Sequence, residues 1–163
     1  MPGIIRQYRS LFSRSALIGL ILLTTLVTGC AVKLVSDYDA EVKEDIIRVA
    51  QRVDLFWGEL LDTNNTQRTY DRFADQYIQI ETDIRALVMR NEIRLRNEES
   101  TRQANIALEL WVEDRNLHKQ NNSFSDFEAK NHRRQFTRLF TTMAKAEEAK
   151  KMGPTTRSDG DSE

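Results

Sequence analysis

The sequence predicts an all-α fold, an antiparallel up-and-down four-helix bundle, and three observations support this prediction. Residues that break helices are almost absent, because between Cys30 and Met152 the only glycine is Gly58 and no proline occurs. Four stretches carry apolar residues at steps that alternate between three and four, the spacing of one helix face against a core. Short polar links separate these stretches, and such links favour antiparallel neighbours.

The first predicted helix covers residues 39–61 and the second covers residues 70–95. Ser36, Asp37 and Asp39 offer side-chain oxygens that can cap the first amides of the first helix. The polar run 62–66 is typical of a turn. The apolar stripes that define the two helices are Val42, Ile46, Val49, Val53, Phe56 and Leu60 in the first, and Tyr70, Phe73, Tyr77, Ile80, Ile84 and Leu87 in the second.

The third helix is predicted over residues 101–119, because Ser100 and Gln103 have the spacing of a capping box. Its stripe consists of Ala104, Ala107, Leu108, Trp111 and His118. The polar run 120–123 indicates a loop. Ser125 and Glu128 repeat the capping-box spacing and begin the fourth helix, whose stripe is Ala129, His132, Phe136, Leu139, Met143 and Ala146. Since no glycine or proline separates the second helix from the third, the alternative is a three-helix bundle with one long bent helix.

Charge supports closure of the bundle between the first and last helices, which are neighbours in an up-and-down arrangement. Residues 37–62 hold eight acidic and three basic residues, whereas residues 126–151 hold four acidic and seven basic residues. From residue 30 onward the chain holds 21 basic and 25 acidic residues, a net charge of −4. This balance excludes a strong nucleic-acid binder, so no nucleic acid is expected among the partners.

The amino-terminal segment has the layout of an export signal. Arg6, Arg9 and Arg14 precede the uncharged stretch 16–26, and small residues follow it. This stretch is too short to span a bilayer, which needs about 20 apolar residues. The predicted organisation is therefore a cleaved signal peptide at 1–29, a lipidated linker at 30–36, the helical bundle at 37–151 and a disordered tail at 152–163.

The four residues Val27-Thr28-Gly29-Cys30 resemble the lipobox of bacterial lipoproteins. The resemblance implies a diacylglycerol on the sulfur of Cys30, cleavage before it and acylation of the new amino terminus. Cys30 is the only cysteine, so an exported chain would have no internal disulfide partner for it. The alternative is a plain signal anchor in which Cys30 is incidental. Alanine at position 31 resembles the outer-membrane sorting pattern, which places the protein on the periplasmic face of the outer membrane, with the inner membrane as the alternative.

Three segments of the remaining chain also resemble those of a group of proteins. Residues 34–39, 77–85 and 144–151 look like the matching parts of small, uncharacterised helical lipoproteins of Gram-negative bacteria. The resemblance implies a helical fold and an envelope location, and it implies no activity.

Only His118 and His132 could act as an imidazole acid, base or metal ligand. A hairpin near Ser123 would bring them close together with Glu113, Asp114 and Glu128 nearby, a geometry in which a metal site is conceivable. The chain lacks the HExxH or repeated ExxH spacing that places several ligands on one helix face. We therefore expect no metal ligand and two structural histidines that fix helix register or bind a carboxylate. No nucleophile–base pair and no phosphate-binding glycine loop occurs, so the sequence predicts no enzyme and no cofactor.

Two surfaces are candidates for binding. A basic strip on the fourth helix could bind an anionic envelope component or an acidic partner, or it could be a solvated face; it comprises Lys130, Arg133, Arg134 and Arg138. The aromatic residues could line a ligand groove or form the core; they are Trp57, Tyr70, Phe73, Tyr77, Trp111, Phe136 and Phe140.

The function predicted from these features is that of a lipid-anchored periplasmic helical bundle, a non-catalytic binding or scaffolding module of the cell envelope. The alternatives are a periplasmic small-ligand carrier and a metal-dependent enzyme. The expected partners are the membrane, through lipid on Cys30, and an envelope protein or anionic envelope component. The oligomeric state is left open.

Overall fold

The computed structural model describes residues 35–152, which belong to one compact unit. It contains four α-helices, α2 (Ala40–Asp62), α3 (Tyr70–Glu92), α4 (Glu98–Asn121) and α5 (Asp126–Ala149), and the short 3-10 helices η1 (Asn65–Gln67) and η2 (Lys150–Met152). No strand occurs within residues 35–152. The predicted all-α four-helix bundle is therefore confirmed. The predictions for the signal peptide, for Cys30 and for residues 153–163 lie outside the described residues.

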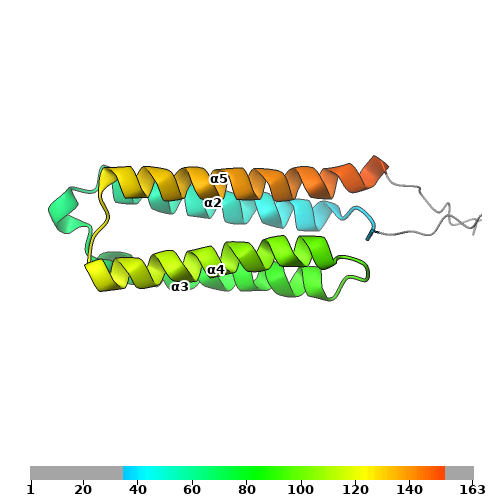
Figure 1. Ribbon diagram of the computed structural model, residues 1–163, viewed down its shortest axis with the longest axis horizontal. Coiled ribbons are helices and arrows are strands. Elements are labelled where there is room, and N and C mark those ends of the chain that lie inside the picture. The colour runs from blue at the N-terminus through cyan, green and yellow to red at the C-terminus, as the bar shows by residue number, and fades with distance from the viewer. Residues whose placement is uncertain (1–34, 153–163) are drawn as a thin grey trace, which may run out of the picture. The chain divides into compact units, whose positions relative to one another are not determined.

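The helices form two layers, with α2 and α5 in one and α3 and α4 in the other (Figure 1). The most extensive packing is between α2 and α5 and between α3 and α4. The predicted closure of the first helix on the last is thus confirmed, and two ion pairs cross this seam, Lys43–Glu148 and Asp54–Arg133. Within the part of the chain that the structure describes, no helix is both long and apolar enough to cross a membrane.

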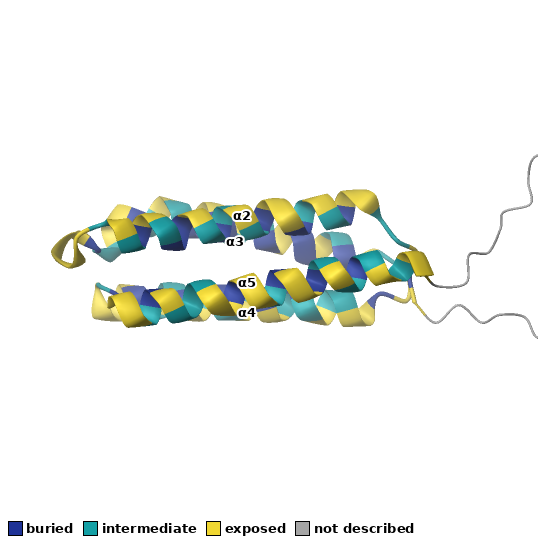
Figure 2. Ribbon diagram, turned by 90° about the horizontal axis from the view of Figure 1, so that it is seen from above, coloured by how far each residue is buried: buried dark blue, intermediate teal, exposed yellow. Residues whose placement is uncertain are grey.

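The buried face of α2 follows the predicted stripe at every position, and those of α3 and α4 follow theirs except at Tyr70 and Leu108, which are partly buried (Figure 2). The stripe predicted for α5 is wrong in its second half, because Phe140 and Glu147 are buried where Leu139 and Ala146 were expected. His132 is also only partly buried.

Phe56 lies at the centre of the aromatic core, since its ring contacts four other rings edge-on at centroid distances of 4.6 to 5.6 Å. Those four rings belong to Trp57, Phe73, Tyr77 and Trp111. Such edge-to-face contacts suit the quadrupoles of aromatic rings. Most of the aromatic residues considered for a ligand groove are therefore core residues.

Two of the three predicted helix caps are present. The carboxylate of Asp39 accepts hydrogen bonds from the amides of Glu41 and Val42 at the start of α2. Ser125 and Glu128 form a capping box at the start of α5. The capping box predicted from Ser100 is wrong, because α4 begins at Glu98 behind Asn97. The Ser100 hydroxyl instead accepts a hydrogen bond from Lys150 of η2.

The alternative of one long bent helix is also wrong, since α3 ends at Glu92 rather than at residue 95 and a turn separates it from α4. Arg96 adopts a left-handed backbone conformation with φ of 59°. The buried Asn97 side chain donates to the main-chain and side-chain oxygens of Asn91 and accepts from the hydroxyl of Ser36. These bonds reverse the chain without glycine or proline.

Several predicted boundaries shift by one to three residues. Ser36 belongs to the bundle and not to the linker, because its amide donates to the carbonyl of Arg96 at 2.9 Å. Helix α4 continues to Asn121 and is followed by Asn122 in the left-handed conformation, so the loop begins later than residue 120. Asp62 ends α2 instead of beginning the turn, and Met152 belongs to η2 instead of the tail.

Candidate functional site

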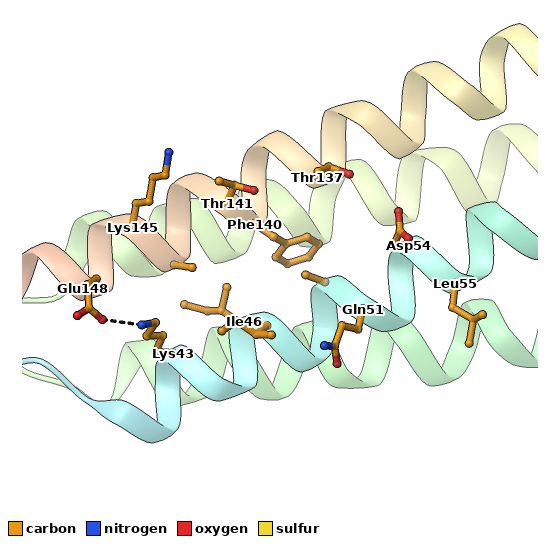
Figure 3. A pocket seen from close by; sticks show the side chains of 13 residues that line it. Lys43, Ile46, Gln51, Asp54, Leu55, Thr137, Phe140, Thr141, Lys145 and Glu148 are labelled. Atoms are coloured by element: carbon orange, nitrogen blue, oxygen red, sulfur yellow. Dashed lines mark hydrogen bonds and ion pairs between the residues drawn. The ribbon is translucent and has the colours of Figure 1, made fainter.

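A groove lies on the surface between α2 and α5, here called the α2–α5 groove (Figure 3). Its volume is about 730 Å³ and it is open to solvent. Its apolar floor is formed by Ile46 and Ala50 of α2 and by Phe140 and Ala144 of α5. The two alanines leave room beside the large Phe140 ring that longer side chains would fill. Ile46 and Phe140 are themselves almost fully buried, so the accessible apolar surface of the groove comes from the partly buried Ala50 and Ala144 and from the side chains at its edge.

Ion pairs mark the two ends of the groove. At one end Lys43 Nζ lies 2.6 Å from a carboxylate oxygen of Glu148. At the other end the guanidinium of Arg133 donates two hydrogen bonds, of 2.6 and 2.7 Å, to the carboxylate of Asp54. The hydrogen bonds from Arg133 hold the pKa of Asp54 below its usual value. Both pairs are partly solvated, so they position the helices more than they stabilise them.

The outer edge of α2 beside the groove carries exposed apolar side chains. Ile47 and Leu55 line the groove, and 41% and 61% of their surfaces are accessible. Gln51 lies between them on the same edge, and Thr137, Thr141 and Lys145 line the opposite edge on α5. An apolar floor with a polar and charged border is the usual make-up of a protein-binding surface.

The structure divides the basic strip predicted on α5. Arg133 turns toward α2 and is bound to Asp54. Lys130 lies 3.6 Å from Asp126 on its own helix, and Arg134 donates to the side chain of Asn131. Arg138 is exposed and has no ion-pair partner within residues 35–152. The four side chains therefore do not act as one strip.

His118 is completely buried and both of its ring nitrogens are occupied. Nε2 lies 2.9 Å from the carbonyl oxygen of Arg68, and Nδ1 lies 3.1 Å from the hydroxyl of Tyr77. Because a carbonyl oxygen only accepts, Nε2 carries the proton and Nδ1 accepts the Tyr77 hydroxyl. Burial lowers the pKa of His118. This neutral imidazole links α4 to α3 and to Arg68, the residue that follows η1.

His132 contacts a carboxylate instead. Its Nδ1 lies 2.9 Å from Oδ1 of Asp114, and its ring stacks on Trp57 at a centroid distance of 5.2 Å. Burial raises the pKa of Asp114, and the hydrogen bond with His132 opposes this shift. The Phe124 ring contacts both His118 and His132. Among the described residues no group of three or more histidine, cysteine or acidic side chains is placed to hold a metal ion.

A buried charged cluster at the opposite end of the bundle escaped prediction from the sequence. The Glu147 carboxylate, 1% exposed, accepts from the amide of Asp39 at 2.9 Å, from Arg94 at 3.0 Å and from Lys150 at 2.6 Å. Burial alone would raise the pKa of Glu147, but the bonds from Arg94 and Lys150 hold it below its usual value. The spacing of Glu147 could have indicated its burial, because Glu147 lies on the same face of α5 as the buried residues Phe136, Phe140 and Met143.

Comparisons with known proteins give no match to this chain among family models, curated proteins or solved structures. Its function therefore has to be inferred from its own residues.

Proposed function

We propose that this protein is a lipid-anchored, non-catalytic binding or scaffolding module of the bacterial cell envelope. Lipid on Cys30 holds it to the periplasmic face of the outer membrane, and the α2–α5 groove binds a protein partner. The observation that carries the binding role is the open apolar groove with the exposed side chains of Ile47 and Leu55 beside it. Contiguous apolar surface of this kind marks interaction sites.

The position of Cys30 supports the anchoring role. The described bundle begins at Val35, five residues after Cys30. Five residues reach at most about 18 Å, so the end of the bundle that holds Val35 would stay close to the membrane surface. Ser36 is bound to Arg96 and Asn97, which fixes the exit of the chain at that end.

The hydrogen bonding of His118 supports a non-catalytic role for this residue. Both of its ring nitrogens are used within the chain. A general base must reach a substrate proton with a free nitrogen. His118 has none to offer.

The anchor is tested by replacing the lipidated residue. Cys30→Ser should yield unprocessed or soluble protein and should abolish labelling by a fatty-acid probe, because serine provides no thiol for the diacylglycerol. Ala31→Ser, a change of the adjacent residue, should keep the label. Labelling of the Cys30→Ser variant at the level of the unaltered protein would refute the anchor.

The groove is tested by photo-cross-linking in intact cells with the full chain. A photo-reactive amino acid at Leu55, beside the groove, should give a defined cross-linked protein. The same amino acid at Glu109, an exposed position on α4, is the matched control and should not. Equal products at the two positions, or none at Leu55, would contradict the binding role of the groove.

A further inference from the structure

We infer that the α2–α5 groove binds the same groove of a second copy of this chain, with a two-fold axis parallel to the helices. The inference rests on the proposed function and names the partner of that site. It follows from the charges on the two helices that border the groove, from their register and from the size of the face.

The two borders of the groove carry opposite charge. Four of the five exposed charged residues of α2 are acidic, and four of the five on α5 are basic. They are Glu41, Glu44, Arg48, Glu59 and Asp62 on α2, and Asp126, Lys130, Arg134, Arg138 and Lys145 on α5. Glu44 and Lys145 have no ion-pair partner within residues 35–152. Because one border is acidic and the other is basic, the face is complementary in charge to the same face of a copy that is rotated by 180°.

Two orientations of a two-fold axis can bring this face against its copy. An axis along the helices places α2 on α5 of the partner subunit, so that acidic borders meet basic borders. An axis across the helices places α2 on α2 and α5 on α5, so that like charges meet. Juxtaposed like charges disfavour association, and the charges therefore select the axis along the helices.

The register within one copy brings specific residues together. Lys43 lies level with Glu148, and Asp54 lies level with Arg133. Because α2 and α5 are antiparallel, Glu44 lies level with Lys145 across the groove. Rotation about an axis along the helices leaves the position of every residue along that axis unchanged. Glu44 of one copy therefore meets Lys145 of the partner subunit, and by symmetry Lys145 of the first copy meets Glu44 of the partner subunit.

The face is large enough for a stable dimer. A helix of 23 residues is about 35 Å long, and two adjacent helices are about 20 Å wide. The face therefore offers on the order of 700 Å² per copy, close to the roughly 800 Å² per partner of a standard interface. Pairing would cover Ile47 and Leu55, the exposed apolar side chains beside the groove.

The same axis agrees with anchoring in one membrane. Rotation about an axis along the helices leaves the starts of both α2 helices at the same end of the dimer, where both lipids could enter one bilayer. An axis across the helices would place the two starts at opposite ends. Charge and anchoring thus select the same arrangement independently.

Cross-linking between two differently tagged full-length copies tests the arrangement in cells. One copy carries Glu44→Cys and the other carries Lys145→Cys, and a short bismaleimide should join them into a covalent dimer that contains both tags. In both copies the sulfur of Cys30 carries lipid, so Cys30 does not react with the bismaleimide. Either variant expressed alone should give no dimer, and a copy with Glu109→Cys should not couple to one with Lys145→Cys. Absence of the Glu44–Lys145 product would overturn the inference.

Charge reversal tests the energetics with the lipidated protein in detergent. Glu44→Lys or Lys145→Glu alone should weaken the dimer on the order of thirtyfold, since each change places like charges together twice. The double variant should restore dimerisation, and Glu109→Lys should have no effect. Sedimentation over a dilution series measures the dissociation constant. Equal weakening in the single and double variants would overturn the inference.

The outcome at Leu55 separates this inference from the proposed function. A cross-link from Leu55 to another envelope protein and not to a second copy would leave the proposed function intact and refute the dimer. No cross-link from Leu55 to any protein would refute both.

Discussion

Phe56→Ala should remove about 4 to 5 kcal/mol from the free energy of unfolding. Truncation of a buried phenylalanine ordinarily costs about 3 to 5 kcal/mol. Phe56 is 1% exposed and four aromatic rings contact it at centroid distances of 4.6 to 5.6 Å. Each of those rings loses an edge-to-face neighbour, which places the expected cost in the upper half of the range.

The assay is thermal and urea unfolding followed by far-ultraviolet circular dichroism. For a domain of about 120 residues, 1 kcal/mol corresponds to about 4 °C, so the melting temperature should fall by about 15 to 20 °C. Phe127→Ala is the matched control, because 73% of the Phe127 surface is accessible, and its effect should stay within about 0.5 kcal/mol. Similar small losses for both variants would show that the aromatic cluster does not hold the bundle together.

Three further predictions concern the buried polar groups. Glu147→Met should cost about 3 to 5 kcal/mol in urea unfolding, because Arg94 and Lys150 lose their buried counter-charge. Glu148→Met should cost much less, because the ion pairs of this partly exposed carboxylate are solvated. Equal effects of the two substitutions would contradict this prediction. The folded pKa of His118 is lowered, so its contribution to stability is full above the unfolded pKa of about 6.5 and is lost as the pH falls toward the folded pKa. His118→Gln should therefore flatten the urea midpoint between pH 7 and pH 5.5, and an unchanged slope would refute this cause. Protein purified without chelator should hold no stoichiometric transition metal by elemental analysis; one equivalent that disappears when His118 and His132 are both replaced by glutamine would show ligation instead.

The helices themselves could be predicted because their signals are local and repeated. Each stripe of apolar residues spans several turns, and the burial of α2 matches its predicted stripe at every position. The pairing of α2 with α5 was also predictable, since net charges of opposite sign lie on the first and last helices. Fold class and helix order thus follow from patterns that need no knowledge of contacts.

The start of α4 could not be predicted because a tertiary contact decides it. Ser100 has the local spacing of a cap, yet Asn97 precedes the helix and is buried against Asn91 and Ser36. Those partners come from α3 and from the segment before α2. The buried hydrogen bonds of Asn97 outweigh the local capping signal of Ser100. Leaving the buried side-chain amide of Asn97 without partners would cost more free energy than an exposed cap contributes.

The groove was beyond the reach of the sequence for a related reason. Ala50, Phe140 and Ala144 are ordinary core-edge residues in a helical pattern, and only the packing of α2 on α5 leaves space between them. The prediction of one basic strip on α5 was wrong for the same reason. The ion pair between Arg133 and Asp54 depends on the register of α5 against α2, which the sequence does not give. The properties of a single helix are predictable, whereas those of a seam between two helices depend on their register.

The charges along this seam have two distinct roles. Lys43–Glu148 and Asp54–Arg133 join α2 to α5 within one chain and position the two helices against each other. Glu44 and Lys145 lie on the outer borders, and within residues 35–152 they have no partner for their charges. Burial of the apolar stripes drives closure of the bundle, so the fold does not depend on the outer charges. A second copy, turned about an axis along the helices, gives them a function.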